Sequence, residues 1–138
     1  RQEYVLKKGD ILLAMTEQAP GLLGSPILVP ESGMFLHNQR LGKVVKKIEI
    51  ESLFIVELMN TSSIRARIQQ GSTGIKVKHT SPTKIAEIEV GLPPLDLQHH
   101  FATIVESIEQ QKTSQRAHLA ELDILFAALQ QRAFNGEL

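Results

Sequence analysis

Polar and basic side chains gather at three places in the first eighty residues, each in or beside a predicted loop. The first place begins at Thr16, the second at His37 and the third at Gln69. Arg and Lys suit phosphates and guanine, and Asn and Gln can pair through two hydrogen bonds with adenine. These stretches therefore contain the side-chain types that DNA base readout needs, although ordinary solvated loops contain the same types.

The candidate DNA-contacting residues divide by chemistry. Lysines would hold phosphates and so position the domain, whereas amides and Arg would reach base edges. The phosphate candidates are Lys43, Lys46, Lys47, Lys76 and Lys78. The base-edge candidates are Gln18, Asn38, Gln39, Arg40, Gln69 and Gln70, and Thr16, Ser72, Thr73 and His79 complete the set. The pair Gln39-Arg40 has a structural alternative, because polar pairs on a strand often bracket a loop by hydrogen bonds.

No catalytic signature accompanies these residues. The chain contains no Cys, no Gly-x-Ser-x-Gly elbow, no phosphate loop ending in Lys-Ser/Thr and no His-Glu-x-x-His. The loop at residues 71–74 is rich in small residues but lacks the lysine and the helix that hold a phosphate. His99 and His100 point to different faces of one helix, and the five histidines are more typical of surface or capping positions than of a metal site. We expect a non-enzymatic chain without metal or cofactor.

The elements that would position these residues change character near Pro94. Eight of the nine glycines and all six prolines lie at or before it. Short apolar runs separated by turn signals predict a β-rich domain, and helical spacing between residues 51 and 70 predicts two short helices, the second capped by Ser62 or Ser63. The fold class is therefore α+β, a small β-rich domain followed by one long helix. The predicted strands are residues 4–6, 11–15, 27–29, 41–45, 75–78 and 85–90.

The long helix is predicted from Leu95 to Phe134, after Pro93 and Pro94 and before an Asn-Gly stop. It would measure roughly 60 Å, longer than any core a ninety-residue domain could offer, so much of its apolar stripe needs another helix. Lys112 and Gln115 at the centre are either a polar layer that selects register or the place where the partner is absent. The heptad seam consists of Phe101, Val105, Ile108, Lys112, Gln115, Leu119, Leu122, Phe126, Leu129 and Ala133.

Composition restricts the function classes further. A chain of 138 residues allows one modest core, and its longest apolar run, residues 11–15, is far too short to span a membrane. The absence of Cys fits the cytoplasm. The net charge is zero, yet residues 1–90 hold twelve Lys/Arg against nine Asp/Glu and residues 91–138 hold three against six. A mildly basic front permits contact with nucleic acid. Because Arg1 stands where Met would, we expect a piece of a longer polypeptide.

Several motifs together resemble the specificity subunit of type I restriction-modification enzymes. They are GDILLAM, SPILVPE, NQRLGKVV, GLPPLDLQHHFATIVESIEQQK and LAELDILFAALQQRAFNGEL. The last two are the most diagnostic, and the resemblance covers nearly the whole chain. In this family a recognition domain ends in a strand, here residues 88–90. A Leu-Pro-Pro-Leu-x-x-Gln entry follows, here Leu92 to Gln98, and then a long helix.

The resemblance implies that residues 1–91 are part of a DNA target recognition domain and residues 92–138 a conserved helix. Such a domain reads one half of a split site in double-stranded DNA, and partner methylation and restriction subunits carry the catalysis. The helix would pair with a second conserved helix of the full-length subunit or of a homodimer partner. The chain has one such helix where a complete subunit has two, which suggests a C-terminal fragment or a half-length subunit. The rival hypotheses are an oligomerising scaffold with a protein-binding β-domain and an enzyme such as a nuclease or methyltransferase.

Overall fold

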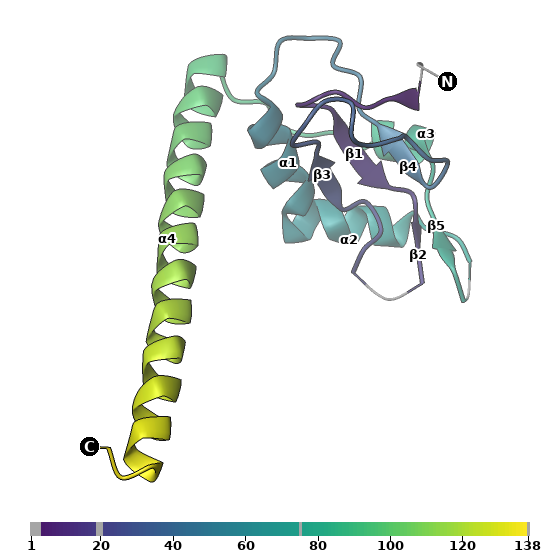
Figure 1. Ribbon diagram of the computed structural model, residues 1–138. Helices are drawn as coiled ribbons and strands as arrows, with labels where there is room; N and C mark the ends of the chain where they lie inside the picture. The colour runs from purple at the N-terminus through teal and green to yellow at the C-terminus, as the bar shows by residue number, and fades with distance from the viewer. Residues whose placement is uncertain (1–3, 19–20, 75, 138) are drawn as a thin grey trace. The chain divides into compact units, whose positions relative to one another are not determined.

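The computed structural model describes residues 4–18, 21–74 and 76–137. The chain divides into two compact units, Arg1–His99 and His100–Leu138. The first unit contains two small antiparallel sheets and short helices, and one long helix runs to the C-terminal region (Figure 1). This arrangement confirms the α+β fold class predicted from the sequence.

The larger sheet has three strands in the order β3-β1-β4. Strand β1 (Ile11–Ala14) lies in the middle and pairs antiparallel with β3 (Pro26–Leu28) and with β4 (Leu41–Lys43). On the β3 side Leu12 lies opposite Ile27. These strands confirm three of the six predicted extended segments, within a residue or two at each end.

One hydrophobic cluster packs against this sheet. Leu6, Leu12 and Val29 are each about 3% exposed, and Leu41 of β4 packs against them. The predicted strand at residues 4–6 takes part through a single bridge, Val5 to Leu36, rather than as a full strand.

A second, two-stranded sheet continues from the end of β1. After Met15, strand β2 (Thr16–Glu17) pairs antiparallel with β5 (Lys78–His79), and the two lie side by side in Figure 1. Thr16 lies opposite His79. The predicted strand at residues 75–78 was placed too early, because β5 begins only at Lys78, and Ile75 lies outside the described residues.

Helices α1 (Ser52–Asn60), α2 (Ser62–Gln70) and α3 (Pro82–Ala86) complete the first unit. The first two confirm the pair of short helices predicted between residues 51 and 70. The second hydrophobic cluster is formed by Leu23, Ile64 and Ile68, with Leu58, Met59, Ile85 and Ile88 packed around them.

The predicted cap of α2 was wrong. The helix begins at Ser62 itself, and Thr61 occupies the N-cap position with an extended backbone and without a side-chain cap hydrogen bond. The Thr61 hydroxyl is directed backwards instead, donating to the Leu58 carbonyl at 2.7 Å. Thr61 is both the C-cap of α1 and the N-cap of α2, so the sequence signal at Ser62 or Ser63 lay one or two residues too late.

The predicted strand at residues 85–90 was also wrong. Residues up to Ala86 belong to α3, and the remainder runs as a turn and irregular chain. Helix α3 has clear start signals, since the Ser81 hydroxyl accepts the Lys84 N–H and Pro82 stands at the first helical position. Alternating Ile residues favoured a strand, but Ile85 and Ile88 pack into the cluster from a helix and the turn that follows it.

Helix α4 (Leu95–Phe134) has the predicted bounds. The Pro94 carbonyl accepts the N–H groups of Leu97 and Gln98, so the proline stands at the start of the helix, where its missing N–H costs nothing. At the other end Gly136, at φ +72°, donates to Ala133, and Glu137 donates to Arg132. These two hydrogen bonds form a Schellman motif, which requires a left-handed residue such as glycine.

Candidate nucleic-acid interface

Two adjoining depressions on the first unit bring together several of the predicted DNA-contacting residues. The first measures about 670 Å³ and the second about 780 Å³, and Asn38 and Arg40 line both. The first is lined by Ala14, Thr16, Glu17, Gln18, Leu22, Asn38, Arg40, Leu41, Val77 and His79. The second is lined by Tyr4, His37, Asn38, Gln39 and Arg40.

Backbone hydrogen bonds hold the three polar stretches in one place. The β2–β5 ladder sets Thr16 beside His79, and the Met15 N–H donates to the Arg40 carbonyl at 2.9 Å. The turn before β4 is fixed by the Asn38 side chain, whose Oδ1 accepts the Arg40 N–H at 2.9 Å. Stretches that are far apart in the sequence thus border the same hollow, each presented by a strand or a strand end.

Asn38 therefore stabilises the turn before β4, besides any contact that it makes with a ligand. Its Oδ1 is used inside the turn, and a hydrogen bond between a side chain and the backbone two residues on is the usual role of Asn before a turn. Gln39 and Arg40 stay exposed, and no side-chain hydrogen bond of either lies within the described residues. The alternative that these two bracket the loop finds no such bond to support it there.

Glu17 is the residue of this site that sequence reasoning missed. Its side chain is only 5% exposed, and its Oε2 accepts the N–H groups of Gly21, Leu22 and Leu23 at 3.1, 2.9 and 2.8 Å. Its Oε1 accepts from Nε2 of Gln69 at 2.8 Å. Burial disfavours the charged carboxylate, but these hydrogen bonds outweigh it and hold the pKa of Glu17 below its usual value.

A signal for Glu17 was present in the sequence. Leu13, Met15 and Glu17 alternate along an extended segment, and all three are buried. A carboxylate in phase with two core residues points inward and must find hydrogen-bond donors there, because an unpaired buried charge is costly. The glycine-containing loop that follows supplies those donors from its backbone.

Gln69 and Lys78, both candidates for DNA contact, take part in the same network. While Nε2 of Gln69 donates to Glu17, its Oε1 accepts from Nζ of Lys78 at 3.1 Å. Ser72 is also engaged, since its hydroxyl donates to the Gln69 carbonyl at 2.6 Å. Three of the predicted contact residues are therefore held by partners within the chain.

The other candidate lysines also divide into those that have a partner within the chain and those that are exposed. Lys43 forms an ion pair with Asp10 at 2.6 Å, and Lys46 donates to the Ile50 carbonyl and to the Ser52 hydroxyl. Lys47 and Lys76 are exposed, as are Gln70 and Thr73. The backbone of Thr73 pairs with His79 through hydrogen bonds of 3.0 and 2.8 Å, which closes the loop before β5.

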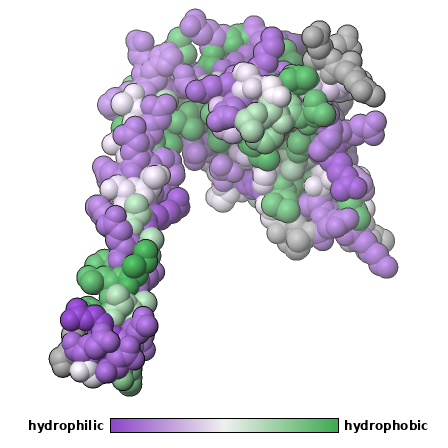
Figure 2. All heavy atoms as spheres, in the orientation of Figure 1, coloured by the Kyte–Doolittle hydropathy of each residue, from purple (hydrophilic) through white to green (hydrophobic). Residues whose placement is uncertain are grey.

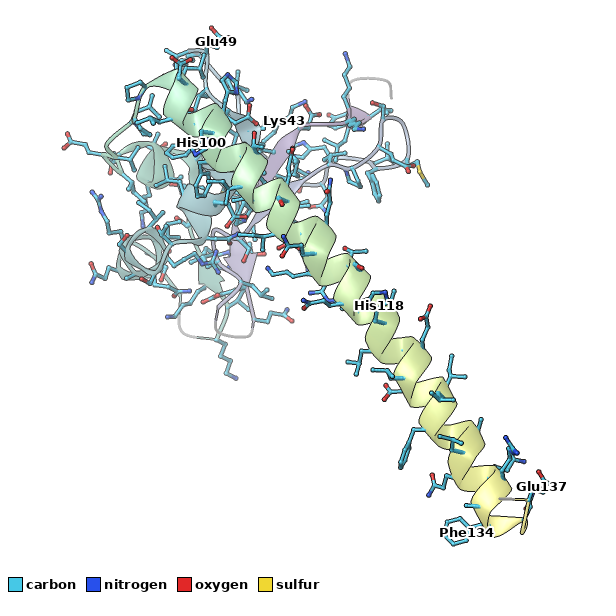
Figure 3. The ribbon with its side chains drawn as sticks, turned by 90° about the vertical axis from the view of Figure 1, so that its left-hand side faces the viewer. Lys43, Glu49, His100, His118, Phe134 and Glu137 are labelled. Atoms are coloured by element: carbon cyan, nitrogen blue, oxygen red, sulfur yellow. The ribbon has the colours of Figure 1, made fainter. Side chains whose placement is uncertain are left out.

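In the second unit, the predicted seam of α4 exposes its apolar side chains. Leu119, Leu122, Phe126 and Leu129 are 59, 60, 69 and 42% exposed, and Figure 2 shows an apolar band near the C-terminal end of the helix. Val105 is half-buried, and Phe101 and Ile108 are partly exposed. Side chains project from the helix on several sides, among them His118 and Phe134 (Figure 3).

The central polar positions of the seam, Lys112 and Gln115, are both exposed. Nζ of Lys112 donates to Oε1 of Glu109 at 2.6 Å along the same face of the helix. Lys112 and Arg116 hold the pKa of the Glu109 carboxyl below its usual value. A charged side chain in the seam thus has a partner within its own helix.

Features typical of a metal site or a membrane span are missing from residues 4–18, 21–74 and 76–137. There, no three His, Asp or Glu side chains are grouped so that they could hold a metal ion. His99 lies 3.4 Å from the Glu51 carboxylate through its Nδ1. None of the helices in this part of the chain has both the length and the apolar character that a membrane crossing requires.

No protein-family model matches this chain, and no curated protein is similar enough to it to count as a relative.

Proposed function

We propose that this chain is a non-catalytic DNA sequence-recognition module of the kind found in type I restriction-modification specificity subunits. The observation that carries the proposal is the convergence of Gln18, Asn38 and Arg40 around two adjoining depressions. Amide and guanidinium groups pair with base edges through two hydrogen bonds, and here they come from two separate segments of the chain. Lysines that lie outside the depressions, such as Lys47 and Lys76, would contact phosphates and fix the register.

The long helix would serve the same function in a different way. A roughly 60 Å helix with an exposed apolar seam fits a rod that pairs with a second helix and sets the distance between two recognition domains. Methylation subunits would dock on this rod, and the methylation and restriction subunits would supply the chemistry. The module would thus read one half of a bipartite site.

Binding of double-stranded DNA under two salt concentrations tests the proposal. A pool of random duplexes of about 30 base pairs, long enough for an interface of ordinary size, is incubated with the full chain, and bound sequences are enriched and read. Affinity that falls steeply with salt, together with an enriched sequence, supports recognition.

Arg40→Ala should weaken binding to the enriched duplex about tenfold and relax the preference at one base position. Arg116→Ala, an Arg on α4 outside the depressions, is the matched control and should leave the preference unchanged.

An oligomerising scaffold is the second candidate, favoured by the exposed seam at Leu119, Leu122 and Phe126. An apolar helix interface is insensitive to salt, whereas phosphate contacts are not. A chain that self-associates equally at both salt concentrations and enriches no duplex from the random pool would be assigned to this class instead.

A further inference from the structure

Glu17 is one of the residues that line the first depression, yet its side chain is only 5% exposed. Its neighbours Thr16 and Gln18 line the same depression and are more exposed, as expected where successive side chains of an extended segment point to opposite sides. Oε2 of Glu17 receives three successive backbone N–H groups, those of Gly21, Leu22 and Leu23. Three donors directed at one oxygen fix the backbone of residues 21–23, which lie between β2 and β3.

The other oxygen of Glu17 extends this control to the opposite wall. It accepts from Gln69 near the end of α2, and Gln69 in turn accepts from Lys78 of β5. Lys78 lies opposite Glu17 in the β2–β5 ladder, next to His79, which lines the depression together with Leu22 of the loop. The buried carboxylate of Glu17 thus connects two parts of the chain that border the depression. It binds residues 21–23 directly and reaches strand β5 through Gln69 at the end of α2.

Every hydrogen-bonding group in this relay has a defined direction. The carboxylate of Glu17 can only accept, the amide of Gln69 donates with its nitrogen and accepts with its oxygen, and the Lys78 ammonium can only donate. The order acceptor, amide, donor is therefore satisfied in one orientation of the Gln69 side chain. Loop and strand are held in one relative arrangement as a result.

We propose that Glu17, Gln69 and Lys78 form a positioning relay that sets the shape of the DNA-reading depression without contacting DNA. The inference rests on the proposed function, and it reassigns Gln69 and Lys78 from base and phosphate contacts to residues that act through Thr16, Gln18 and His79. Sequence preference then depends on residues that never touch a base.

An exchange of the carboxylate and the amide between positions 17 and 69 tests the relay. In Glu17→Gln alone, the new amide nitrogen meets the Gln69 nitrogen, and if Gln69 turns over, its nitrogen meets the Lys78 ammonium instead. In Gln69→Glu alone, two carboxylates face each other in a buried site. In the double variant, the amide at position 17 donates to the carboxylate at position 69 and accepts the loop N–H groups, while that carboxylate accepts from Lys78. Each single variant breaks the order of donors and acceptors, and the double variant restores it.

Amide hydrogen exchange at Leu22 and Leu23 in the full chain measures the relay without any ligand. We expect each single variant to speed this exchange about tenfold or more, because a buried polar group left without a partner is costly, and the double variant to restore most of the protection. Equal protection in all four proteins would overturn the relay. If a single variant does not fold, the double variant still decides, because failure to restore protection there also overturns it.

Selection from the same random duplex pool then tests the effect on DNA. The single variants should bind the duplex that the unchanged protein enriches about tenfold more weakly and should enrich altered sequences, whereas the double variant should recover both affinity and preference. Recovered loop protection without recovered preference would overturn the link between relay and readout. An unchanged protein that enriches no duplex would overturn the proposed function itself, and the exchange data would still decide the relay.

Discussion

Oε1 of Gln98, in the first turn of α4, accepts a hydrogen bond at 3.0 Å from the backbone N–H of Glu51, 47 residues earlier. Nε2 of the same side chain donates to the Pro93 carbonyl at 2.8 Å, and Gln98 is only 2% exposed. Glu51 is the N-cap residue of α1. One amide thus joins the start of the short helix to the start of the long one, which gives a physical reason for a Gln shortly after the proline pair.

Gln98→Ala should destabilise the first unit by about 1–3 kcal/mol, because it leaves the Glu51 N–H and the Pro93 carbonyl without their partner. Urea denaturation followed by circular dichroism would measure the loss. Gln110→Ala, an exposed Gln on the same helix, is the matched control and should change stability by less than about 0.5 kcal/mol. Equal effects of the two substitutions would contradict the joint.

The long helix illustrates what sequence reasoning predicts well. Its bounds, Leu95 and Phe134, follow from local signals: two prolines before the first turn, forty residues without Gly or Pro, and an Asn-Gly stop. Each signal acts within a turn or two of its own position. The strands of the larger sheet could be predicted equally well, because turn residues stand at both ends of each apolar run.

The segment at residues 85–90 and the partners of Glu17 were harder to predict. Ser81 and Pro82 are local start signals for α3, but they compete with the strand-like alternation of Ile85 and Ile88, which pack against a cluster whose other members come from residues 23 to 68. The partners of Glu17 lie up to 52 residues away. The candidate residues could be grouped by their chemistry. Which of them line a depression and which form hydrogen bonds within the chain depends on long-range strand pairing and packing, which only the folded structure shows.

Acid should weaken the first unit through Glu17. The pKa of its carboxyl is lowered in the folded chain from the ordinary value of 4.5, so its contribution to stability is complete above that pH and is lost as the pH falls through the folded value. Urea denaturation at neutral pH and at successively lower pH would follow this loss. In Glu17→Gln the stability should be lower at neutral pH and depend less on pH below 4.5.

Asp10 provides the comparison for this pH dependence. Burial raises the pKa of its carboxyl, but Lys43 and the Lys7 N–H more than offset this, so the pKa of Asp10 is lowered in the folded chain, as that of Glu17 is. Its contribution to stability is therefore also lost in acid. Asp10→Asn should remove its own share of the acid sensitivity and leave the amide protection of Leu22 and Leu23 intact. If that protection at neutral pH falls in Asp10→Asn as much as in Glu17→Gln, the loop is not held by Glu17.

Neighbouring lysines should behave differently in DNA binding. Lys47 is exposed, whereas the ammonium of Lys46 is bonded to Ile50 and Ser52. Lys47→Ala should lower affinity on all duplexes alike and reduce the slope of log affinity against log salt by about one, as expected for one lost phosphate contact. Lys46→Ala should instead lower stability by about 0.5 kcal/mol, since an exposed lysine contact contributes little. Binding isotherms at several salt concentrations, with a melting curve for each variant, would separate the two. A Lys47→Ala protein with an unchanged slope would remove that lysine from the interface.

Two apolar residues of α4, nearly equal in exposure, should differ in their effect on association. Leu122 lies in the seam and is 60% exposed, and Ile124 lies off the seam and is 71% exposed. Because residues two apart on a helix point to nearly opposite sides, only one of them can face a partner rod. Leu122→Asp should weaken association about tenfold or more, since it would bury a charge in an apolar layer, and Ile124→Asp should not.

Sedimentation velocity across a range of concentrations measures this association, while the amide protection of Leu22 and Leu23 reports whether the first unit remains folded. Equal loss in both variants would mean that association depends on general apolar surface, and unfolding of the first unit in Leu122→Asp alone would mean that the seam belongs to that unit's own core.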